Sequence, residues 1–378
     1  MLAQDQEITV SDRRYVEGVL ANRAGAVARS LELLVPLRES GLANPEREAT
    51  VLQTLGDDYA KIGAYAQSAD AYGELLRRFG PSLPERVRKT ALEDVAVFDL
   101  IRDAPPQTTA LNGPQAIPLR TNRLGLQELQ IQVGSKEDGW VLDTGANLST
   151  ISLSSAQSFG LTLSSKTIQT EGVSGDPVEV HVAVLPELVI EKAIIRNVVV
   201  LVAADKDLAA ANYKIHGIVG FPVLAALGQL TFSADALTIG EPAAAAAGTS
   251  KLFLDEMTPL IAATAGGVAH LFTLDTGAGR TVLSARYARA HAKDFSEATA
   301  GTRQLTGVGG SRAIRSYTHV TVRLAIAGMQ VTLKDVDVLR EAVGTDEDSF
   351  YGILGRDALR QFGTYTIDFG RMEFSARP

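Results

Sequence analysis

WVLDTGA (residues 140–146) and FTLDTGA (residues 272–278) are two copies of one short segment in a chain of 378 residues. Each copy closes an apolar run with Asp-Thr-Gly-Ala. A bare Asp-Thr-Gly occurs by chance in about one chain of this length in ten at ordinary composition. Two copies with matching flanks therefore indicate a duplicated element rather than a coincidence.

The similarity extends beyond these segments. When Asp143 is aligned with Asp275, the runs that precede the two aspartates also align without a gap. Later in the chain the offset is slightly longer, and it relates residues 217–220 to residues 352–355. A single three-residue insertion between Ser284 and Gly307 reconciles the two offsets. The pattern predicts two homologous lobes.

Composition limits the classes of function. With 46% hydrophobic and 21% charged residues the chain has an ordinary globular composition, and its length suffices for two or three domains. No apolar run approaches the roughly 20 residues that cross a bilayer. A net charge of −8 without a basic cluster argues against a nucleic-acid partner. The absence of cysteine excludes disulfides, thiol catalysis and Cys-based zinc sites.

Other chemistries lack their patterns. The five histidines show no paired spacing of metal ligands, and the acidic residues between Asp335 and Asp348 lack the spaced acceptors of a calcium loop. Ser152 and Ser284 have no histidine and aspartate spacing of a serine hydrolase. We therefore expect no metal site and no cofactor.

Residues 1–105 differ from the rest because their apolar residues recur at helical spacing, with proline and glycine between the segments. We expect four or five helices. A set of small and aromatic residues resembles one tetratricopeptide repeat: Leu55, Gly56, Tyr59, Gly63, Tyr65, Tyr72 and Pro81. Because a free solenoid normally needs three or more repeats, we expect one such helical hairpin within an α-helical domain.

The remaining boundaries follow from composition. A stretch rich in Pro, Thr and Gly predicts a linker over residues 106–116. Alternating apolar residues then predict strands in a first lobe, residues 117–240, and in a second lobe, residues 251–378. An alanine run bounded by proline and glycine predicts a connector over residues 241–250. The predicted fold is mainly β, with two β-barrel-like lobes after the helical domain.

The paired aspartates, Asp143 and Asp275, have a chemical use if the lobes bring them together. Two carboxyl groups at hydrogen-bonding distance cannot both ionise readily, so they share one proton and one pKa rises. One group can then take a proton from water while the other gives a proton to a peptide carbonyl. We predict that Asp143 and Asp275 are catalytic.

The neighbours of the aspartates fit the same interpretation. Gly145 and Gly277 are expected to allow a tight turn and to leave their N–H groups free to donate. Thr144 and Thr276 carry hydroxyls suited to hydrogen bonds between the lobes. We assign these four residues to the support of the active-site loops.

Residues 117–378 resemble the pepsin-like and retroviral-type aspartic proteases. Besides Asp-Thr-Gly, that superfamily has a hydrophobic-hydrophobic-Gly motif in each lobe, which Ile218-Val219-Gly220 and Ile353-Leu354-Gly355 match. The resemblance implies a bilobal acid-protease fold that cleaves a peptide or protein held in a cleft between the lobes. These enzymes are the standard example of two aspartates that share a proton.

Several features favour the retroviral type. Each lobe has only about 120 residues, alanine follows both Asp-Thr-Gly motifs, and Gly355-Arg356-Asp357 is similar to the retroviral Gly-Arg-Asp turn. The expected architecture is a retroviral-type dimer fused into one chain. Phe221-Pro222 stands where the second lobe has Arg356-Asp357, so an ion pair of Arg356 would have no counterpart.

Each lobe also has a glycine-rich segment at the flap position, Gly172-Val173-Ser174-Gly175 and Gly307-Val308-Gly309-Gly310. Flexible glycines at a tip suit a lid that opens for a peptide and then binds its backbone. A plain tight hairpin is the alternative. A phosphate loop is not favoured, because no Lys-Ser or Lys-Thr follows either segment.

The sequence thus predicts an aspartic endopeptidase. Its helical domain is either a structural cap or a surface that recruits a substrate or a protein partner. The alternatives are a peptide-binding module that has lost turnover and a scaffold that acts through its helical domain. We also consider that residues 1–105 restrain activity. Because Ala146 and Ala278 offer no hydroxyl to the carboxylates, we expect activity at mildly acidic pH.

The chain starts Met1-Leu2-Ala3-Gln4, with neither a basic nor an apolar segment of a signal peptide. We expect a bacterial periplasmic or secreted protein whose signal peptide is not part of this chain, with a cytoplasmic protein as the alternative. The substrate and its cleavage site do not follow from the sequence, because pocket side chains set specificity.

Overall fold

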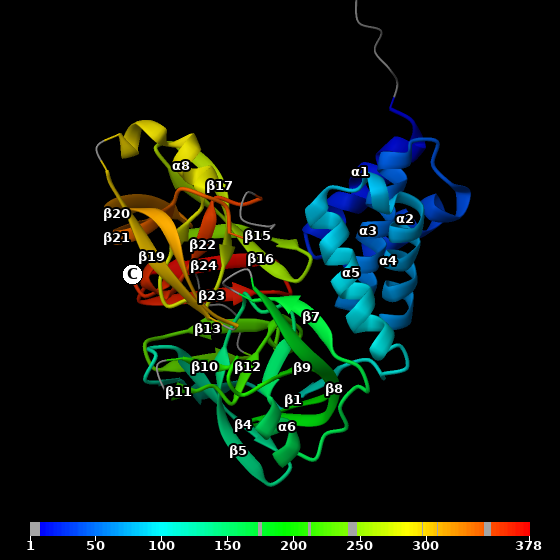
Figure 1. Cartoon of the computed structure of the whole chain (residues 1–378), viewed down its shortest axis with the longest axis horizontal. Coiled ribbons are helices and arrows are strands. Elements are labelled where there is room, and N and C mark those ends of the chain that lie inside the picture. The colour runs from blue at the N-terminus through cyan, green and yellow to red at the C-terminus, as the bar shows by residue number, and fades with distance from the viewer. Residues whose placement is uncertain are drawn as a thin grey trace, which may run out of the picture. The chain divides into compact units, whose positions relative to one another are not determined.

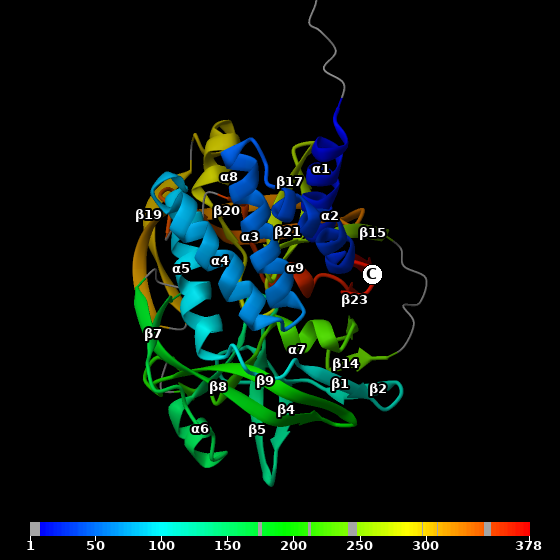
Figure 2. The same cartoon turned by 90° about the vertical axis from the view of Figure 1, so that its right-hand side faces the viewer.

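The computed structural model describes residues 8–172, 176–210, 213–240, 248–296, 298–307, 309–343 and 349–378. The chain divides into two compact units, Met1–Pro106 and Gln107–Pro378. The first unit is helical and the second consists mainly of strands (Figures 1 and 2), which confirms the predicted fold class. No helix in the described ranges is both long and apolar enough to cross a membrane.

The helical unit is a series of helices in which each packs on the next. Its helices are α1 (Val10–Arg23), α2 (Val27–Ser40), α3 (Pro45–Lys61), α4 (Tyr65–Phe79), the short 3-10 helix η1 (Gly80–Ser82) and α5 (Glu85–Leu100). Local signals start two of them: Thr9 caps α1, and Asn44 caps α3 ahead of Pro45. The core between α2 and α3 contains Leu34, Leu37 and Leu55.

Two consecutive hairpins, α1–α2 and α3–α4, repeat one turn geometry. Gly25 and Gly63 have φ angles of 71° and 72°, in the left-handed region that glycine tolerates best. The N–H groups of Ala26 and Ala64 donate to carbonyls five residues earlier, at 2.8 and 2.9 Å. The sequence indicated only the second hairpin, because the aromatic residues that mark α3–α4 have no counterparts in α1–α2.

Both hairpins also cross at a glycine. A Cβ on Gly18 would lie 2.4 Å from the Leu34 side chain, and a Cβ on Gly56 would lie 2.7 Å from the Tyr72 ring. Glycine is therefore required at these positions for space rather than for an unusual backbone angle.

This close approach predicts that Gly56→Ala destabilises the helical unit by about 1 to 3 kcal/mol, because the added methyl overpacks against Tyr72. Gly73→Ala in α4 is the matched control. Its Cβ would meet nothing within 4 Å, so the higher helix propensity of alanine should stabilise by up to about 1 kcal/mol. Urea unfolding of the full chain, followed by far-UV circular dichroism, measures both. Equal effects of the two substitutions would contradict the packing account.

The first lobe is built on one sheet with the strand order β1-β9-β6-β12-β5-β4-β8-β7, and β3 pairs with β4. Its strands are β1 (Thr108–Leu111), β3 (Arg120–Thr121), β4 (Gln127–Val133), β5 (Lys136–Leu142), β6 (Ser149–Ser152), β7 (Ile168–Glu171), β8 (Pro177–Ile190), β9 (Ala193–Ala203) and β12 (Gly217–Val219). Helices α6 (Leu153–Ser158) and α7 (Phe221–Ala226) and the small hairpin of β10 (Ala209–Ala210) and β11 (Tyr213–Lys214) complete it.

The second lobe repeats this connectivity. Its strands are β15 (Gly248–Asp255), β16 (Thr258–Ala265), β17 (Val268–Leu274), β18 (Val282–Leu283), β19 (Thr299–Gly307), β20 (Gly310–Ile326), β21 (Met329–Leu339), β22 (Gly352–Leu354), β23 (Thr364–Asp368) and β24 (Glu373–Arg377). Its helices are α8 (Ala285–Ala290), η2 (Ala292–Phe295) and α9 (Arg356–Leu359). In each lobe the strand that ends before the aspartate, β5 or β17, runs parallel to a short strand, β12 or β22.

The two lobes share six consecutive strands in the order β2-β14-β13-β23-β24-β15. Strands β2 (Gln115–Pro118), β13 (Gln229–Phe232) and β14 (Ala236–Ile239) come from the first lobe. At the centre Thr231 faces Thr366, with their hydroxyl oxygens 2.9 Å apart, and Phe232 stacks on Tyr365 with ring centroids 4.6 Å apart. This shared sheet joins the lobes into one unit.

The structure differs from the sequence prediction in the expected linker, residues 106–116. Strand β1 lies within this segment and pairs with β9, with Thr108 opposite Arg196. Edge pairing of this short strand satisfies backbone groups that a free linker would leave to water. Of the predicted connector, residues 248–250 begin β15, and residues 241–247 lie outside the described residues.

Candidate active site

Asp143 and Asp275 occupy equivalent positions, directly after β5 and β17. The Asp143 N–H donates to the carbonyl of Val219 at 3.1 Å, and the Asp275 N–H donates to the carbonyl of Leu354 at 3.1 Å. Both acceptors belong to the hydrophobic-hydrophobic-Gly strands β12 and β22. Each aspartate is thus held at the end of a buried parallel strand pair, which fixes where its side chain can point.

Thr144 and Thr276 bind each other across the lobes. The N–H of each threonine donates to the hydroxyl oxygen of the other at 3.0 Å. The Thr144 hydroxyl donates to the carbonyl of Leu274 at 2.6 Å, and the Thr276 hydroxyl donates to the carbonyl of Leu142 at 3.0 Å. Both threonines are fully buried, so these four hydrogen bonds are shielded from water.

Gly145 and Gly277 let the two loops approach closely. A Cβ on Gly145 would lie 2.8 Å from Cγ of Asp275, and a Cβ on Gly277 would lie 2.3 Å from Cγ of Asp143. Neither glycine has a positive φ angle. An unusual backbone angle is therefore not the reason for glycine here; the opposite carboxyl group occupies the space of a side chain.

The carboxyl groups of Asp143 and Asp275 each lie against the glycine of the opposite motif, which brings the two groups together. Burial raises the pKa of Asp143 well above its ordinary value, and the negative charge of Asp275 raises it further. Burial also raises the pKa of Asp275, partly offset by hydrogen bonds from the Ala278 N–H, the Asp143 carboxyl and the Gly277 N–H. The pair therefore retains one proton at a pH where free aspartates are ionised.

Two hydroxyl residues that the sequence analysis did not identify support the loops from below. Ser149 and Thr281 accept a hydrogen bond from the N–H of Gly220 and Gly355, respectively, each at 3.1 Å. Their separation in the sequence equals that of the two aspartates, and this shared offset was the signal that could have revealed them. Asp357 binds the N–H and hydroxyl of Thr281, both at 2.7 Å.

Arg356 links the second lobe to the first. Its side chain is buried, and one Nη donates to the carbonyl of Gly125. Burial lowers the pKa of Arg356 to about 10. Its Nε and other Nη have no hydrogen-bond partner among the described residues. This guanidinium therefore bridges the lobes through a backbone carbonyl.

The described residues of the predicted flap segments lie next to the β7–β8 and β19–β20 strand pairs. In the first lobe Gly172 follows β7, and its N–H donates to the carbonyl of Asp176 at 2.8 Å; Val173, Ser174 and Gly175 lie outside the described residues. In the second lobe Gly307 and Gly310 close the β19–β20 hairpin. Gly309 and Gly310 have φ angles of 89° and 128°, while Val308 is likewise outside the described residues.

The two hairpins meet. The Gly309 N–H donates to the carbonyl of Asp207 in the first lobe at 3.1 Å. A Cβ on Gly309 would lie 2.6 Å from Cγ2 of Val178 and 3.3 Å from Cα of Gly172. The second-lobe tip therefore rests against the first-lobe hairpin and the loop that contains Asp207.

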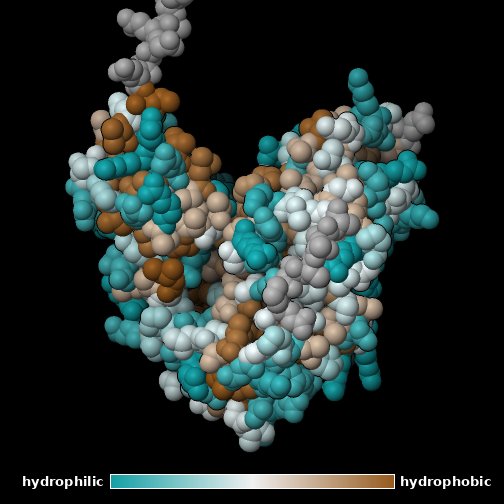
Figure 3. Space-filling view, turned by 180° about the vertical axis from the view of Figure 1, so that it is seen from behind, coloured by the Kyte–Doolittle hydropathy of each residue, from teal (hydrophilic) through white to brown (hydrophobic). Residues whose placement is uncertain are grey.

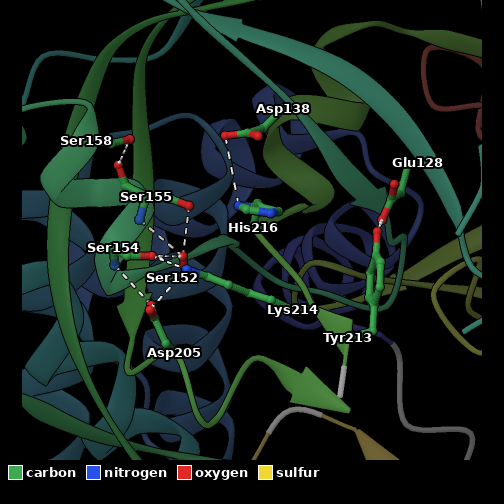
Figure 4. Close-up of polar contacts among 10 residues, drawn as sticks. All are labelled: Glu128, Asp138, Ser152, Ser154, Ser155, Ser158, Asp205, Tyr213, Lys214 and His216. Atoms are coloured by element: carbon green, nitrogen blue, oxygen red, sulfur yellow. Dashed lines mark hydrogen bonds and ion pairs between the residues drawn. The ribbon is translucent and has the colours of Figure 1, made fainter. Parts of the chain in front are cut away.

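A polar group anchors the loop that contains Asp207 (Figure 4). Asp205 accepts hydrogen bonds from the Ser154 N–H and the Lys214 ammonium, each at 3.0 Å. Lys214 also contacts the Ser154 hydroxyl. Because Lys214 is ion-paired with Asp205, this serine-rich group is a structural anchor and not a nucleophile with its base.

The site therefore holds two carboxyl groups that share a proton, beside backbone N–H donors. Such a pair can accept and donate protons in one reaction. No group of three or more metal-ligating side chains occurs among the residues that the structure describes.

A family profile described as aspartyl protease matches residues 129–223 and 261–358, together more than half of the chain. Each matched range contains one Asp-Thr-Gly and one hydrophobic-hydrophobic-Gly motif. No curated protein sequence matches this chain. Among solved structures, the Basic 7S globulin from soybean is similar with a TM-score of 0.46 and 11% identity, over 70% of this chain and 95% of that chain. A similarity this distant identifies neither an activity nor a substrate.

The threonine contact generates a stability prediction. Thr144→Val keeps the side-chain shape but leaves the Thr276 N–H and the Leu274 carbonyl without their partner. The expected loss is about 2 to 4 kcal/mol. Thr273→Val in β17 is the control, because its hydroxyl meets a carbonyl only at 3.5 Å. Urea unfolding followed by tryptophan fluorescence measures both, and a Thr144→Val protein as stable as the control would refute the role of this contact.

Proposed function

This chain belongs to the aspartyl protease family, and we propose that it is an active aspartic endopeptidase, a single-chain retroviral-type pseudo-dimer with Asp143 and Asp275 as its catalytic residues. The observation that carries the proposal is the close approach of the two aspartates across the loops, with the pKa of each carboxyl group raised by burial. A protein that only bound peptides would have no need for two partly buried carboxyl groups so close together, because their repulsion and desolvation cost folding free energy.

The pair holds one proton, and because the two loops are nearly equivalent either carboxyl group can carry it. We write the reaction with the proton on Asp143. Asp275 then takes a proton from water as the water oxygen attacks the scissile carbonyl carbon. Asp143 gives its proton to the carbonyl oxygen, which produces a neutral tetrahedral diol.

The second half of the reaction restores the pair. Asp275 transfers its proton to the leaving nitrogen as the C–N bond breaks, and Asp143 takes a proton from one hydroxyl of the diol. A carboxylic acid, an amine and the starting protonation state result. The threonine contact keeps both carboxyl groups in position through these steps, so little reorganisation is needed.

We assign the substrate to the extended peptides that a cleft between the lobes would hold. In this proposal the hairpin tips around Gly172 and Gly309 cover the cleft and offer backbone hydrogen bonds to the peptide. Opening would require the 3.1 Å contact between Gly309 and Asp207 to break.

The helical unit is proposed to contact the protein substrate. Large hydrophobic side chains are exposed in and just before its first helix, with Ile8 before the helix at 72%, and Val10 and Leu20 within it at 70% and 62%. Figure 3 shows hydrophobic side chains gathered on this end of the unit. That this unit restrains the active site stays a hypothesis, which removal of residues 1–105 would test through the cleavage rate.

The proposal predicts that the purified chain cleaves members of a diverse peptide library and that Asp143→Asn and Asp275→Asn each reduce the rate by roughly 10² to 10⁴-fold. Asp235→Asn, in the exposed turn between β13 and β14, is the charge-matched control and should cleave at the wild-type rate. Mass spectrometry of the products between roughly pH 3.5 and 7.5 provides the readout.

The pH dependence follows from the raised pKa of Asp143. Activity needs one proton on the pair, so it should persist at mildly acidic pH and fall as the pH rises through the pKa of Asp143. No cleavage by the folded wild-type chain at any pH would contradict the proposal and favour the peptide-binding alternative. Cleavage that survives in Asp143→Asn would place the activity elsewhere.

A further inference from the structure

Strand β17, which leads into Asp275, carries a buried histidine that faces a second histidine. His270 is only 8% exposed, and its Nε2 lies 2.8 Å from Nε2 of His291 at the end of α8. The ring centroids are 5.0 Å apart, so the two nitrogen atoms point at each other. This is the geometry of one hydrogen bond that contains a single proton, and not of two ligands that converge on a metal ion.

Aromatic and charged groups enclose the pair. Tyr351 stacks on His270 at 4.0 Å and Tyr287 stacks on His291 at 4.4 Å, both between ring centroids. Nδ1 of His291 lies 3.5 Å from the carboxylate of Asp294. The remaining charged group is Arg286, whose guanidinium lies over the Tyr351 ring. In the described part of the chain, Asp294, His291 and His270 therefore form a carboxylate–imidazole–imidazole row.

The side chains of this row can hold only a limited number of protons. Burial lowers the pKa of His270, and the nearby His291 and Arg286 lower it further. A proton on His291 is compensated by Asp294. A further proton on His270 would place two N–H groups and two positive charges against each other across the short Nε2–Nε2 contact, so the rings would have to separate.

Separation of the rings would act on the second catalytic loop. The Tyr351 N–H donates to the carbonyl of Leu271 at 2.9 Å, and the Tyr351 carbonyl accepts from the N–H of Ser284, the N-cap of α8, at 3.1 Å. Strand β22 starts at the next residue and supplies the Leu354 carbonyl that holds the Asp275 N–H. The pair therefore lies where β17, α8 and the support of Asp275 meet.

The first lobe has a different pair at this place. Asp138 precedes Asp143 by five residues, as His270 precedes Asp275, and His216 occupies the position of Tyr351. Nδ1 of His216 lies 4.0 Å from the Asp138 carboxylate (Figure 4). Here an imidazole faces a carboxylate and not a second imidazole. The repeat therefore does not explain the histidine pair, which belongs to the second lobe.

We propose that His270 and His291 form an acid-sensitive pair that positions the second catalytic loop and releases it when both rings are protonated. The consequence for catalysis rests on the proposed function. The effect on the stability of the β-rich unit does not, so the two are tested separately.

The direction of the effect on stability is determined by the lowered pKa of His270. An unfolded chain protonates this residue near pH 6.5, whereas the folded chain does so only at lower pH. In the interval between these values the unfolded state binds more protons, so stability is lost as the pH falls. One proton changes the folding equilibrium by up to about tenfold per pH unit.

The test compares His270→Gln with the wild type and with His216→Gln as the matched control. Glutamine can keep a hydrogen bond to His291 but does not titrate. Trp140, the only tryptophan of the chain, reports urea unfolding of the β-rich unit at a series of pH values from neutral to acidic. For each unit by which the pH falls, the folding equilibrium constants of the wild type and of His216→Gln should decrease by up to about tenfold more than that of His270→Gln.

Two further readouts make the outcome decisive. Histidine ring NMR of the wild type should show one resonance, absent in His270→Gln, that titrates below the ordinary pKa of histidine. Peptide cleavage by His270→Gln should persist to lower pH than cleavage by the wild type. The proposed acid-sensitive pair is overturned if His270 titrates at the ordinary pKa of histidine. It is also overturned if unfolding of the wild type and of His270→Gln has the same pH dependence.

Failures of the two proposals are distinguishable. The wild type and His270→Gln could stop cleaving at the same acidic pH although their unfolding differs in pH dependence. That result overturns only the positioning role. If the wild type cleaves nothing, the proposed function fails, and the NMR and unfolding results still decide the acid-sensitive pair. If His270→Gln does not fold, the variant His291→Gln identifies the His291 resonance. Titration of the His270 resonance in the wild type then decides whether the pair is acid-sensitive.

Discussion

The four hydrogen bonds between Thr144 and Thr276 and the strand ends opposite them are the constraint on which the rest of the site depends. They are buried and reciprocal, so neither lobe can shift without leaving donors or acceptors unpaired. They bring the carboxyl groups of Asp143 and Asp275 together, and this contact explains why glycine is needed at positions 145 and 277. The six-stranded sheet that the lobes share holds the same relationship from a distance.

The internal repeat made much of this arrangement predictable. Two identical motifs whose flanks align with a single three-residue insertion imply two similar lobes, and the mainly β fold after a helical unit is confirmed. Contacts between segments distant in sequence were not predictable, because local pattern contains no information on them. Three contacts are of this kind. Gly309 packs against Gly172, Arg356 binds the carbonyl of Gly125, and β1 pairs with β9. Ser149 and Thr281 could have been found, since they share the offset of the aspartates.

The two lobes share a backbone fold, but their charged side chains differ. The strand that leads to Asp143 carries Asp138, which faces His216. The strand that leads to Asp275 carries His270, which faces His291. Arg356 and Asp357 likewise have Phe221 and Pro222 as their counterparts. A fused pair of lobes can therefore give each carboxyl group its own surroundings, which a symmetric dimer of identical chains cannot do.

The central claim, that Asp143 and Asp275 share one proton, is tested most directly by carbon NMR of the aspartate carboxyl groups as a function of pH. The account predicts that both resonances respond to the same two titration steps, and that the later step lies well above the ordinary pKa of aspartate, about 3.9. In Asp275→Asn the coupling should disappear. Two independent single-step titrations near the ordinary value, unchanged by that substitution, would contradict the account.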